Sequence, residues 1–230
     1  MTTFSPTQPV VRSKQAAMDV QDLEGLLRFT IQVKDQEPLY VFYTRIDQVF
    51  VLWGVICTVI FSTAQFSTLG WTEQAIIWSI LTLIGSWGTY GLAWYWVSVE
   101  RKRWVVYAWI GLMIIGIIVT NWGIFGNGWS VLPYLSSLWL GLSAIGYFIT
   151  GWGLRSRAFL LCGGVHLVAI MLLSYIPTWQ YLFSGFITAG SLFLLASFQW
   201  DMYFDSDSQI LTEQQKQFNI DQAKKRSSTL

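Results

Sequence analysis

Residues 104–124 read WVVYAWIGLMIIGIIVTNWGI, a stretch that contains no charged side chain. An apolar run of roughly 18 or more residues is typical of a membrane-spanning helix, because about 20 helical residues cross the hydrocarbon core. This stretch is one of six such runs within residues 46–200. The sequence therefore predicts an all-α polytopic membrane protein, a bundle of six transmembrane helices with short loops.

The loops between the predicted spans are too short to fold alone. We expect the spans at residues 47–66, 75–98, 104–124, 131–153, 158–176 and 179–199. The narrowest separation is VERKR at residues 99–103, where each basic residue would cost about 2.5–3.5 kcal/mol in hydrocarbon. A turn there avoids that cost. The chain then divides into an N-terminal segment (1–45), a six-helix transmembrane domain (46–200) and a C-terminal tail (201–230).

Both ends of the chain are polar. Residues 1–14 contain Pro, Ser and Thr with few large apolar side chains, so we expect disorder there. Residues 17–29 carry apolar side chains at helical spacing, which predicts a short amphipathic helix. In the tail, Thr212 opens a capping-box pattern for a polar helix to about Lys225. Within the membrane domain, residues 121–130 are rich in Gly and Asn and predict a turn.

The charge content limits the partners. Only 12% of the residues are charged, with a net charge of +1, against about 25% charged in an ordinary soluble domain. The expected partners are therefore the lipid bilayer and other membrane proteins, and no nucleic acid.

The basic residues predict the orientation of the chain. All 14 lie before the first span, in the second and fourth loops, or in the tail. Those in the two loops are Arg101, Lys102, Arg103, Arg155 and Arg157. Because Lys and Arg near span ends favour the cytoplasmic side, both termini should be cytoplasmic. The membrane would be a bacterial inner membrane or an internal membrane such as the thylakoid.

Tryptophan is abundant, with 14 residues. Nine of them are expected near the two membrane interfaces, as an aromatic belt on each side. Four lie deeper in the predicted spans, namely Trp53, Trp87, Trp109 and Trp139. These four either pack between helices or contact a bound planar ligand, and packing is the favoured interpretation.

His166 is the only histidine and falls near the middle of the fifth span. Ionisable residues at that depth are candidates for function. Its neighbours one turn away, Cys162, Gly163 and Ala169, are small, which places it at a helix contact. It could be the axial ligand of a haem or chlorophyll-type macrocycle, or a proton-relay group. The favoured alternative is a neutral imidazole hydrogen-bonded within the bundle, so the cofactor is unknown and none is required.

The second span is the most polar of the six. It carries the hydroxyls of Ser79, Thr82, Ser86, Thr89 and Tyr90. They could form a hydrophilic path, although hydroxyls satisfied within the bundle explain them more simply. Small residues four apart also predict close helix contacts. These pairs are Gly85 with Thr89, Ser137 with Gly141, Gly146 with Thr150, and Ser184 with Thr188.

Sequence motifs of catalysis are missing. The chain has no HExxH, GxSxG, P-loop or paired intramembrane carboxylates, so we expect no enzyme and no metal site. The predicted function is that of a non-catalytic accessory, assembly or scaffold subunit of a larger membrane complex. One alternative is a small channel or facilitative transporter. Another is a pigment- or haem-binding membrane protein that uses His166.

Overall fold

The computed structural model describes residues 9–14, 27–31, 39–99, 101–126 and 129–201, together with five helical residues of the tail between Glu213 and Asp221. Within this part of the chain, six helices are long and apolar enough to cross a membrane. They are α1 (Arg45–Phe66), α2 (Trp71–Val99), α3 (Arg103–Phe125), α4 (Leu135–Leu154), α5 (Arg157–Leu172) and α6 (Gln180–Ser197). The predicted all-α bundle of six membrane helices is confirmed.

The ends of α2 and α3 can be compared with the two turns predicted from the sequence. The predicted turn after Val99 is present, and it places Arg101 in a left-handed backbone conformation with φ of 53°. The predicted span 104–124 agrees with α3, which continues to Phe125, so the turn predicted over residues 121–130 was wrong for its first half. Burial of Ile124, with 3% of its surface exposed, favours this continuation. A 3-10 helix, η2 (Trp129–Tyr134), then leads into α4.

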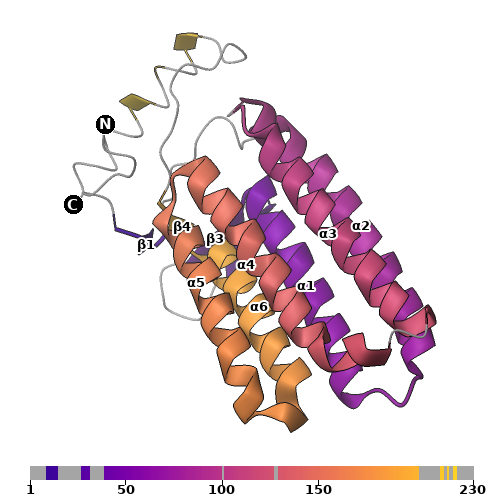
Figure 1. Cartoon of the computed structure of the whole chain (residues 1–230). Helices are drawn as coiled ribbons and strands as arrows, with labels where there is room; N and C mark the ends of the chain where they lie inside the picture. Colours follow the sequence, from indigo (N-terminus) through magenta and orange to yellow (C-terminus); the bar gives the residue numbers. More distant parts are fainter. Residues whose placement is uncertain are drawn as a thin grey trace.

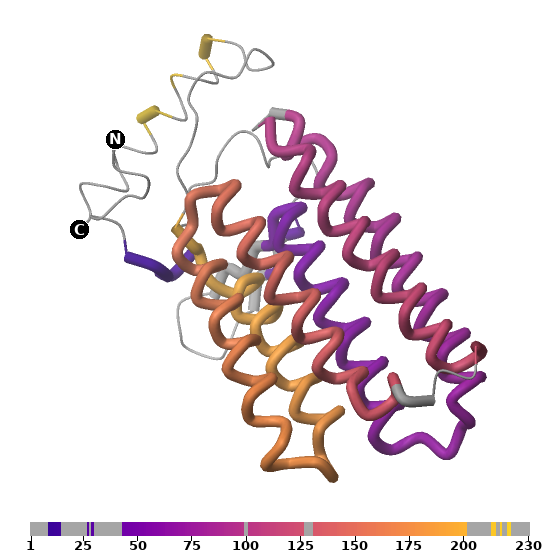
Figure 2. The backbone as a smooth tube through the Cα atoms, in the orientation of Figure 1, coloured from indigo at the N-terminus to yellow at the C-terminus, as the bar shows by residue number. Residues whose placement is uncertain are grey.

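The helices are arranged as two neighbouring groups (Figure 1). The hairpin of α2 and α3 lies on one side, with α2 against α1 and α3 against α4. On the other side α6 packs against α1, and α5 packs against α4. The tube in Figure 2 shows the long, nearly parallel course of these helices. This order leaves α1 and α2 facing α3 and α4 across the interior.

A segment before the bundle meets the segment directly after α6 at one end of the bundle. Strand β1 (Val11–Arg12) pairs antiparallel with β4 (Gln199–Trp200), directly after α6. Nearby, the Lys14 ammonium lies 2.6 Å from the Asp47 carboxylate at the start of α1. The expectation of disorder therefore fails for residues 9–14, because strand pairing and this ion pair hold them against the bundle.

A β-hairpin precedes α1. Strand β2 (Leu27–Ile31) pairs antiparallel with β3 (Leu39–Tyr43), with Leu27 opposite Tyr43. Most of the amphipathic helix predicted over residues 17–29 lies outside the described residues, but its last three positions belong to β2. That prediction was wrong there, because cross-strand pairing with β3 replaces helical hydrogen bonds. In the tail, the described positions of the predicted polar helix are helical.

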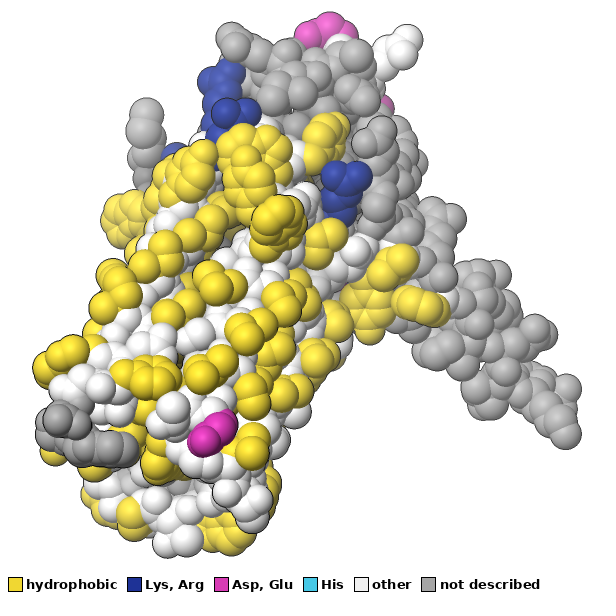
Figure 3. All heavy atoms as spheres, turned by 90° about the vertical axis from the view of Figure 1, so that its right-hand side faces the viewer, with side chains coloured by type: hydrophobic (Ala, Val, Ile, Leu, Met, Phe, Trp, Pro, Cys, Tyr) yellow, Lys and Arg dark blue, Asp and Glu magenta, His cyan; other side chains and the backbone are white. Residues whose placement is uncertain are grey.

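Charge and hydrophobic surface are segregated. Figure 3 shows hydrophobic side chains over the body of the bundle and Lys and Arg gathered towards one end. We call this the basic end and define it by Arg45, Lys102, Arg103, Arg155 and Arg157. The termini of the bundle lie there as well. The opposite end carries the acidic residue Glu73 in the first turn of α2.

Candidate functional site: a cavity along the bundle

The interior of the bundle contains a cavity with a volume of about 160 Å³. Its lining extends over residues 46–61 of α1, 105–120 of α3 and 139–154 of α4. Each stretch rises roughly 22 Å at about 1.5 Å per residue. The hydrocarbon core of a bilayer is about 30 Å thick. The cavity is therefore narrow and follows most of the membrane-spanning length.

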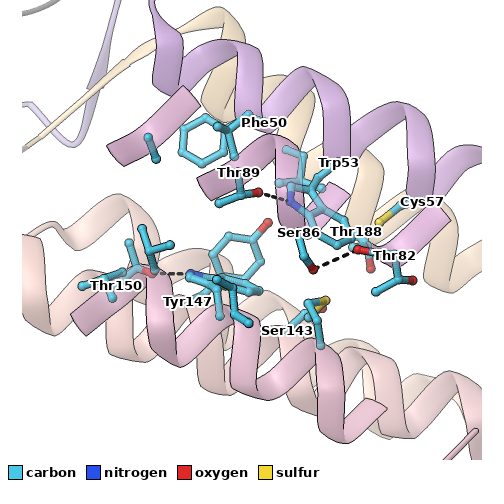
Figure 4. Close-up of a pocket in the computed structure, with 18 of the residues that line it drawn as sticks. Phe50, Trp53, Cys57, Thr82, Ser86, Thr89, Ser143, Tyr147, Thr150 and Thr188 are labelled. Atoms are coloured by element: carbon cyan, nitrogen blue, oxygen red, sulfur yellow. Dashed lines mark hydrogen bonds between the residues drawn. The ribbon is translucent and has the colours of Figure 1, made fainter. Parts of the chain in front are cut away.

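Four helices form the two main walls of the cavity. Figure 4 shows Trp53 and Thr89 on the wall of α1 and α2, and Tyr147 and Thr150 on the facing wall. Helix α6 adds Thr188 at mid-depth. At the basic end the lining includes Phe159 and Trp200, whose rings are 4.9 Å apart in an edge-to-face contact. At the opposite end it includes Thr120 and Trp139.

Tryptophan–threonine hydrogen bonds join the helices around the cavity. In the described part of the chain, four indole N–H groups each donate to a threonine hydroxyl of the neighbouring helix. The pairs are Trp53 with Thr89 (2.7 Å), Trp78 with Thr63 (3.0 Å), Trp109 with Thr150 (2.9 Å) and Trp139 with Thr120 (3.2 Å). Within the α1–α2 pair, and likewise within the α3–α4 pair, each helix donates one of these hydrogen bonds to the other and accepts one from it. Each pair of helices is thus fixed at two depths.

The deep tryptophans predicted from the sequence fall into two groups. Trp53, Trp109 and Trp139 both pack between helices and line the cavity. Trp87 instead has 82% of its surface exposed on the outside of α2. The sequence did not single out Trp78, although it also lines the cavity. A tryptophan one or two turns inside a predicted span is a weak indication of a cavity, because the sequence does not show which helix lies beside it.

Glycines let three of these indole rings approach the neighbouring helix. Each lies four residues before the bonded threonine. A Cβ atom would stand 2.9 Å from the Trp53 ring at Gly85, 2.5 Å from Trp139 at Gly116 and 2.5 Å from Trp109 at Gly146. These distances are closer than a side chain tolerates. The sequence predicted the close contacts at Gly85 and Gly146 but missed the one at Gly116, which follows the same Gly-x-x-x-Thr spacing.

The five hydroxyls predicted to form a polar path divide into four that line the cavity and one that lies outside it. Ser79, Thr82, Ser86 and Thr89 all line the cavity. Tyr90 does not, because it lies on the outer face of α2 against Trp94, with ring centroids 4.7 Å apart.

The four lining hydroxyls are already bonded inside the bundle. Thr82, Ser86 and Thr89 each donate to the backbone carbonyl one turn earlier at 2.7–2.8 Å. Ser79 accepts a hydrogen bond from the Asn121 amide at 2.9 Å. A hydroxyl that donates to its own helix has no proton left for a molecule in the cavity and can only accept from it. The wall of α2 is therefore less polar than its sequence suggests.

Two further polar groups of the lining were not predicted from the sequence as site residues. The Thr188 hydroxyl is buried and has no hydrogen-bond partner within the described part of the chain. Figure 4 shows it beside Thr82 and Ser86, and it shows the Tyr147 hydroxyl pointing into the cavity from the facing wall. A single polar group of a bound molecule could form a hydrogen bond with either hydroxyl. Because Tyr147 and Thr188 are far apart in sequence, no motif marks them.

His166 lies behind the cavity wall. The residue is completely buried, and its ring is 4.9 Å from that of Tyr147, which lines the cavity. Its Nδ1 lies 2.8 Å from the Cys162 carbonyl. Because a carbonyl only accepts, Nδ1 carries the proton. Nε2 then holds a lone pair, which meets no partner among the described residues. Cofactor binding by His166 stays a prediction.

The five basic residues of the loops all lie at the basic end. Arg101 and Arg155 are exposed and adopt left-handed backbone conformations. Arg103 donates from Nε to the Ser98 hydroxyl at 2.9 Å, outside the cavity. Lys102 belongs to the cavity lining. Arg157 forms an ion pair with Asp201 at 2.8 Å.

Asp201 holds the first turn of α5. Its buried carboxylate accepts hydrogen bonds from the backbone N–H groups of Arg157 and Ala158, each at 3.0 Å, and from the Ser156 hydroxyl. A carboxylate at a helix N-terminus satisfies free N–H groups and favours the helix dipole. The segment after α6 is thereby fixed beside Trp200. Sequence reasoning missed this cap, because the partners are more than 40 residues apart.

The candidate metal ligands of the described residues are dispersed. No group of three or more His, Cys, Asp or Glu side chains lies close enough there to hold a metal ion. Comparison with known proteins gives no family model, no curated protein and no solved structure that matches the chain. The cavity is therefore the feature from which a function can be inferred.

Proposed function

We propose that this protein is a non-catalytic membrane protein whose cavity holds a slender, mostly apolar molecule, such as one acyl or polyprenyl chain. The observation that carries the proposal is a volume of about 160 Å³ drawn out along the bundle. A compact apolar cavity of about 150 Å³ stays dry and binds benzene. A similar volume extended over roughly 22 Å of helix rise leaves room for a slender group, such as a segment of one chain, and none for a broad one.

The wall supports an apolar ligand over a hydrophilic solute. Most of the lining is aliphatic or aromatic, and Thr82, Ser86 and Thr89 donate their protons to the backbone. A polar solute would leave water without gaining equivalent hydrogen bonds, at a cost of about 1–3 kcal/mol per unpaired group. If the protein is a channel or facilitative transporter, the solute that it moves is therefore expected to be apolar.

The shape of the cavity argues against a broad macrocycle. The space is drawn out along the helices between two facing walls, and a flat macrocycle would need it to be wide as well as long. His166 is also separated from the cavity by the Tyr147 ring. A pigment or haem is therefore a weaker candidate than a chain.

An accessory subunit of a larger complex is the second candidate. The observation in its favour is that bulky aromatic side chains of the described surface, among them Trp87, Trp152 and Phe186, are more than 70% exposed. Such rings can pack against partner helices as well as lipid. Stoichiometric membrane partners after purification in mild detergent would support this candidate. Recovery as a lone protomer would contradict it.

We infer that the basic end faces the cytoplasm, by the positive-inside rule. The exposed residues Ser13 and Thr68 lie at the two ends of the bundle. In intact cells, a membrane-impermeant maleimide should label Thr68→Cys and leave Ser13→Cys unlabelled until the cells are opened. The reverse pattern would invert the orientation.

Photo-crosslinking tests the proposed function. Hexadecanol carrying a diazirine on its chain should label Cys57 and Met113, which line the cavity from facing walls. Ser86→Leu and Ser143→Leu add bulk inside the cavity and should abolish this labelling. Gly91→Leu is the matched control, because nothing lies within 4 Å of a Cβ at Gly91.

The lipid-facing surface supplies an internal standard for this experiment. Adducts on exposed residues such as Ile114 and Leu83 should appear equally in all variants. Labelling confined to such outer residues, in the wild type and in the filled variants alike, would overturn the proposal.

A further inference from the structure

The basic end of the cavity has one charged residue in its lining. Of the described residues that line the cavity, Lys102 alone carries a charge. It lies in the turn between α2 and α3, between the lining residues Val97 and Val105. The long apolar stem of a lysine can follow such a surface while its ammonium group stays at the polar end.

The buried carboxylates at this end already have cationic partners. Asp47 pairs with Lys14 at 2.6 Å, and Asp201 pairs with Arg157 at 2.8 Å. Lys102 forms no ion pair or side-chain hydrogen bond within the described part of the chain. No described side chain therefore competes for its charge.

The neighbouring arginines differ from Lys102 in their surroundings. The Arg103 guanidinium lies 4.8 Å from the centre of the Trp94 ring and donates to Ser98. Arg101 is exposed in the turn. Neither belongs to the cavity lining. The turn thus holds three basic residues, and one of them borders the cavity.

We propose that the cavity takes a single-chain amphiphile whose anionic group, a carboxylate or a phosphate monoester, binds Lys102. This inference rests on the proposed function, because it requires the chain to occupy the cavity. The chain would extend from Lys102 towards Trp139 at the opposite end. The narrow volume leaves no room for the two chains of a diacyl lipid. Charge-assisted hydrogen bonds are stronger than neutral ones, so the anion sets the direction in which the chain enters.

Competition against the hexadecanol photoprobe tests the anionic group. The competitors are hexadecanoate, hexadecyl phosphate and unlabelled hexadecanol, each added to the full-length protein in nanodiscs of zwitterionic lipid. The readout is the concentration that halves labelling of Met113. At least one anion should compete at about a tenfold lower concentration than the alcohol. The stronger of the two anions identifies the source of the charge.

Substitution in the turn separates the two proposals. Lys102→Gln should raise the half-competing concentration of the anion to that of the alcohol and leave the alcohol unchanged. Arg103→Gln removes the same charge from the same turn and should change neither value. If all three compounds compete equally, and Lys102→Gln changes none of the values, the proposal that Lys102 binds an anionic group is overturned. The proposed function of the cavity would still stand. If no competitor reduces Met113 labelling, both proposals fail.

Discussion

The Trp109 indole donates a 2.9 Å hydrogen bond to the Thr150 hydroxyl across the contact between α3 and α4, and its ring lies over Gly146 one turn earlier. The threonine in turn donates to the Gly146 carbonyl at 2.8 Å. Close approach and hydrogen bonding therefore occur at the same place. The indole–threonine bond and the ring over a glycine recur at Trp53 and at Trp139, and Thr89 also donates to the Gly85 carbonyl at 2.8 Å. These contacts fix the two helices of each cavity wall against one another.

The Trp109–Thr150 hydrogen bond should be measurable as a coupling energy. Thr150→Val keeps the shape of the side chain and removes the acceptor, so it should destabilise the protein by about 0.5–1.5 kcal/mol. In a double-mutant cycle with Trp109→Phe, the coupling should fall in that range. The measurement is the free energy of unfolding in mixed micelles titrated with dodecyl sulfate. A coupling indistinguishable from zero would show that the bond contributes nothing.

Gly146 should resist even a methyl group. Gly146→Ala places a Cβ 2.5 Å from the Trp109 ring, and displacing the ring should cost about 1–3 kcal/mol. Gly111→Ala on α3 is the matched control, since no atom lies within 4 Å of its Cβ. The control should be neutral or stabilising, because alanine favours helix over glycine. Equal effects on thermal unfolding in detergent would contradict the packing described here.

Loss of the α5 cap should weaken the basic end. Asp201→Asn removes the charge that Arg157 and the first N–H groups of α5 share. Because Arg157 is partly exposed, we expect a loss of about 2–3 kcal/mol, below that of a fully buried pair. Glu73→Gln, at an exposed site, should stay within about 0.5 kcal/mol of the wild type. Hydrogen exchange should also increase in the first turn of α5 and nowhere in α3.

His166 offers a test that separates packing from cofactor binding. Its Nε2 is buried without a partner among the described residues, and His166→Phe removes this unpaired atom together with the Nδ1 hydrogen bond to the Cys162 carbonyl, while it keeps a ring against Tyr147. These two losses oppose each other, so the variant should stay within about 1 kcal/mol of the wild type. Its absorption spectrum should match that of the wild type. A strongly destabilised variant that loses a visible absorption band would instead identify His166 as a cofactor ligand.

The membrane helices could be predicted from sequence because hydrocarbon imposes a strict requirement on length and charge. The turn at residues 99–103 followed from the cost of burying Arg101, Lys102 and Arg103. The ordered segment before the bundle could not be found in this way. Its position depends on pairing with β4 and on the Lys14–Asp47 ion pair, and both join residues far apart in sequence.

The candidate site was only partly predictable. The sequence marked Ser79, Thr82, Ser86, Thr89 and Tyr90 as a possible polar path, and the first four of these line the cavity. The facing wall, with Tyr147, could not be inferred, because hydropathy does not say which helices are neighbours. Nor does the sequence separate Lys102 from the arginines beside it. Only the turn geometry places that one residue in the lining.

The most direct test of the central claim is native mass spectrometry of the full-length protein, released from gentle detergent after purification from its own membrane. The wild type should carry the added mass of one single-chain amphiphile. The Ser86→Leu/Ser143→Leu variant, whose cavity is filled from both walls, should appear without it. A wild type that is bare under the gentlest release, or an adduct of equal abundance in the filled variant, would contradict the claim that the cavity holds a ligand.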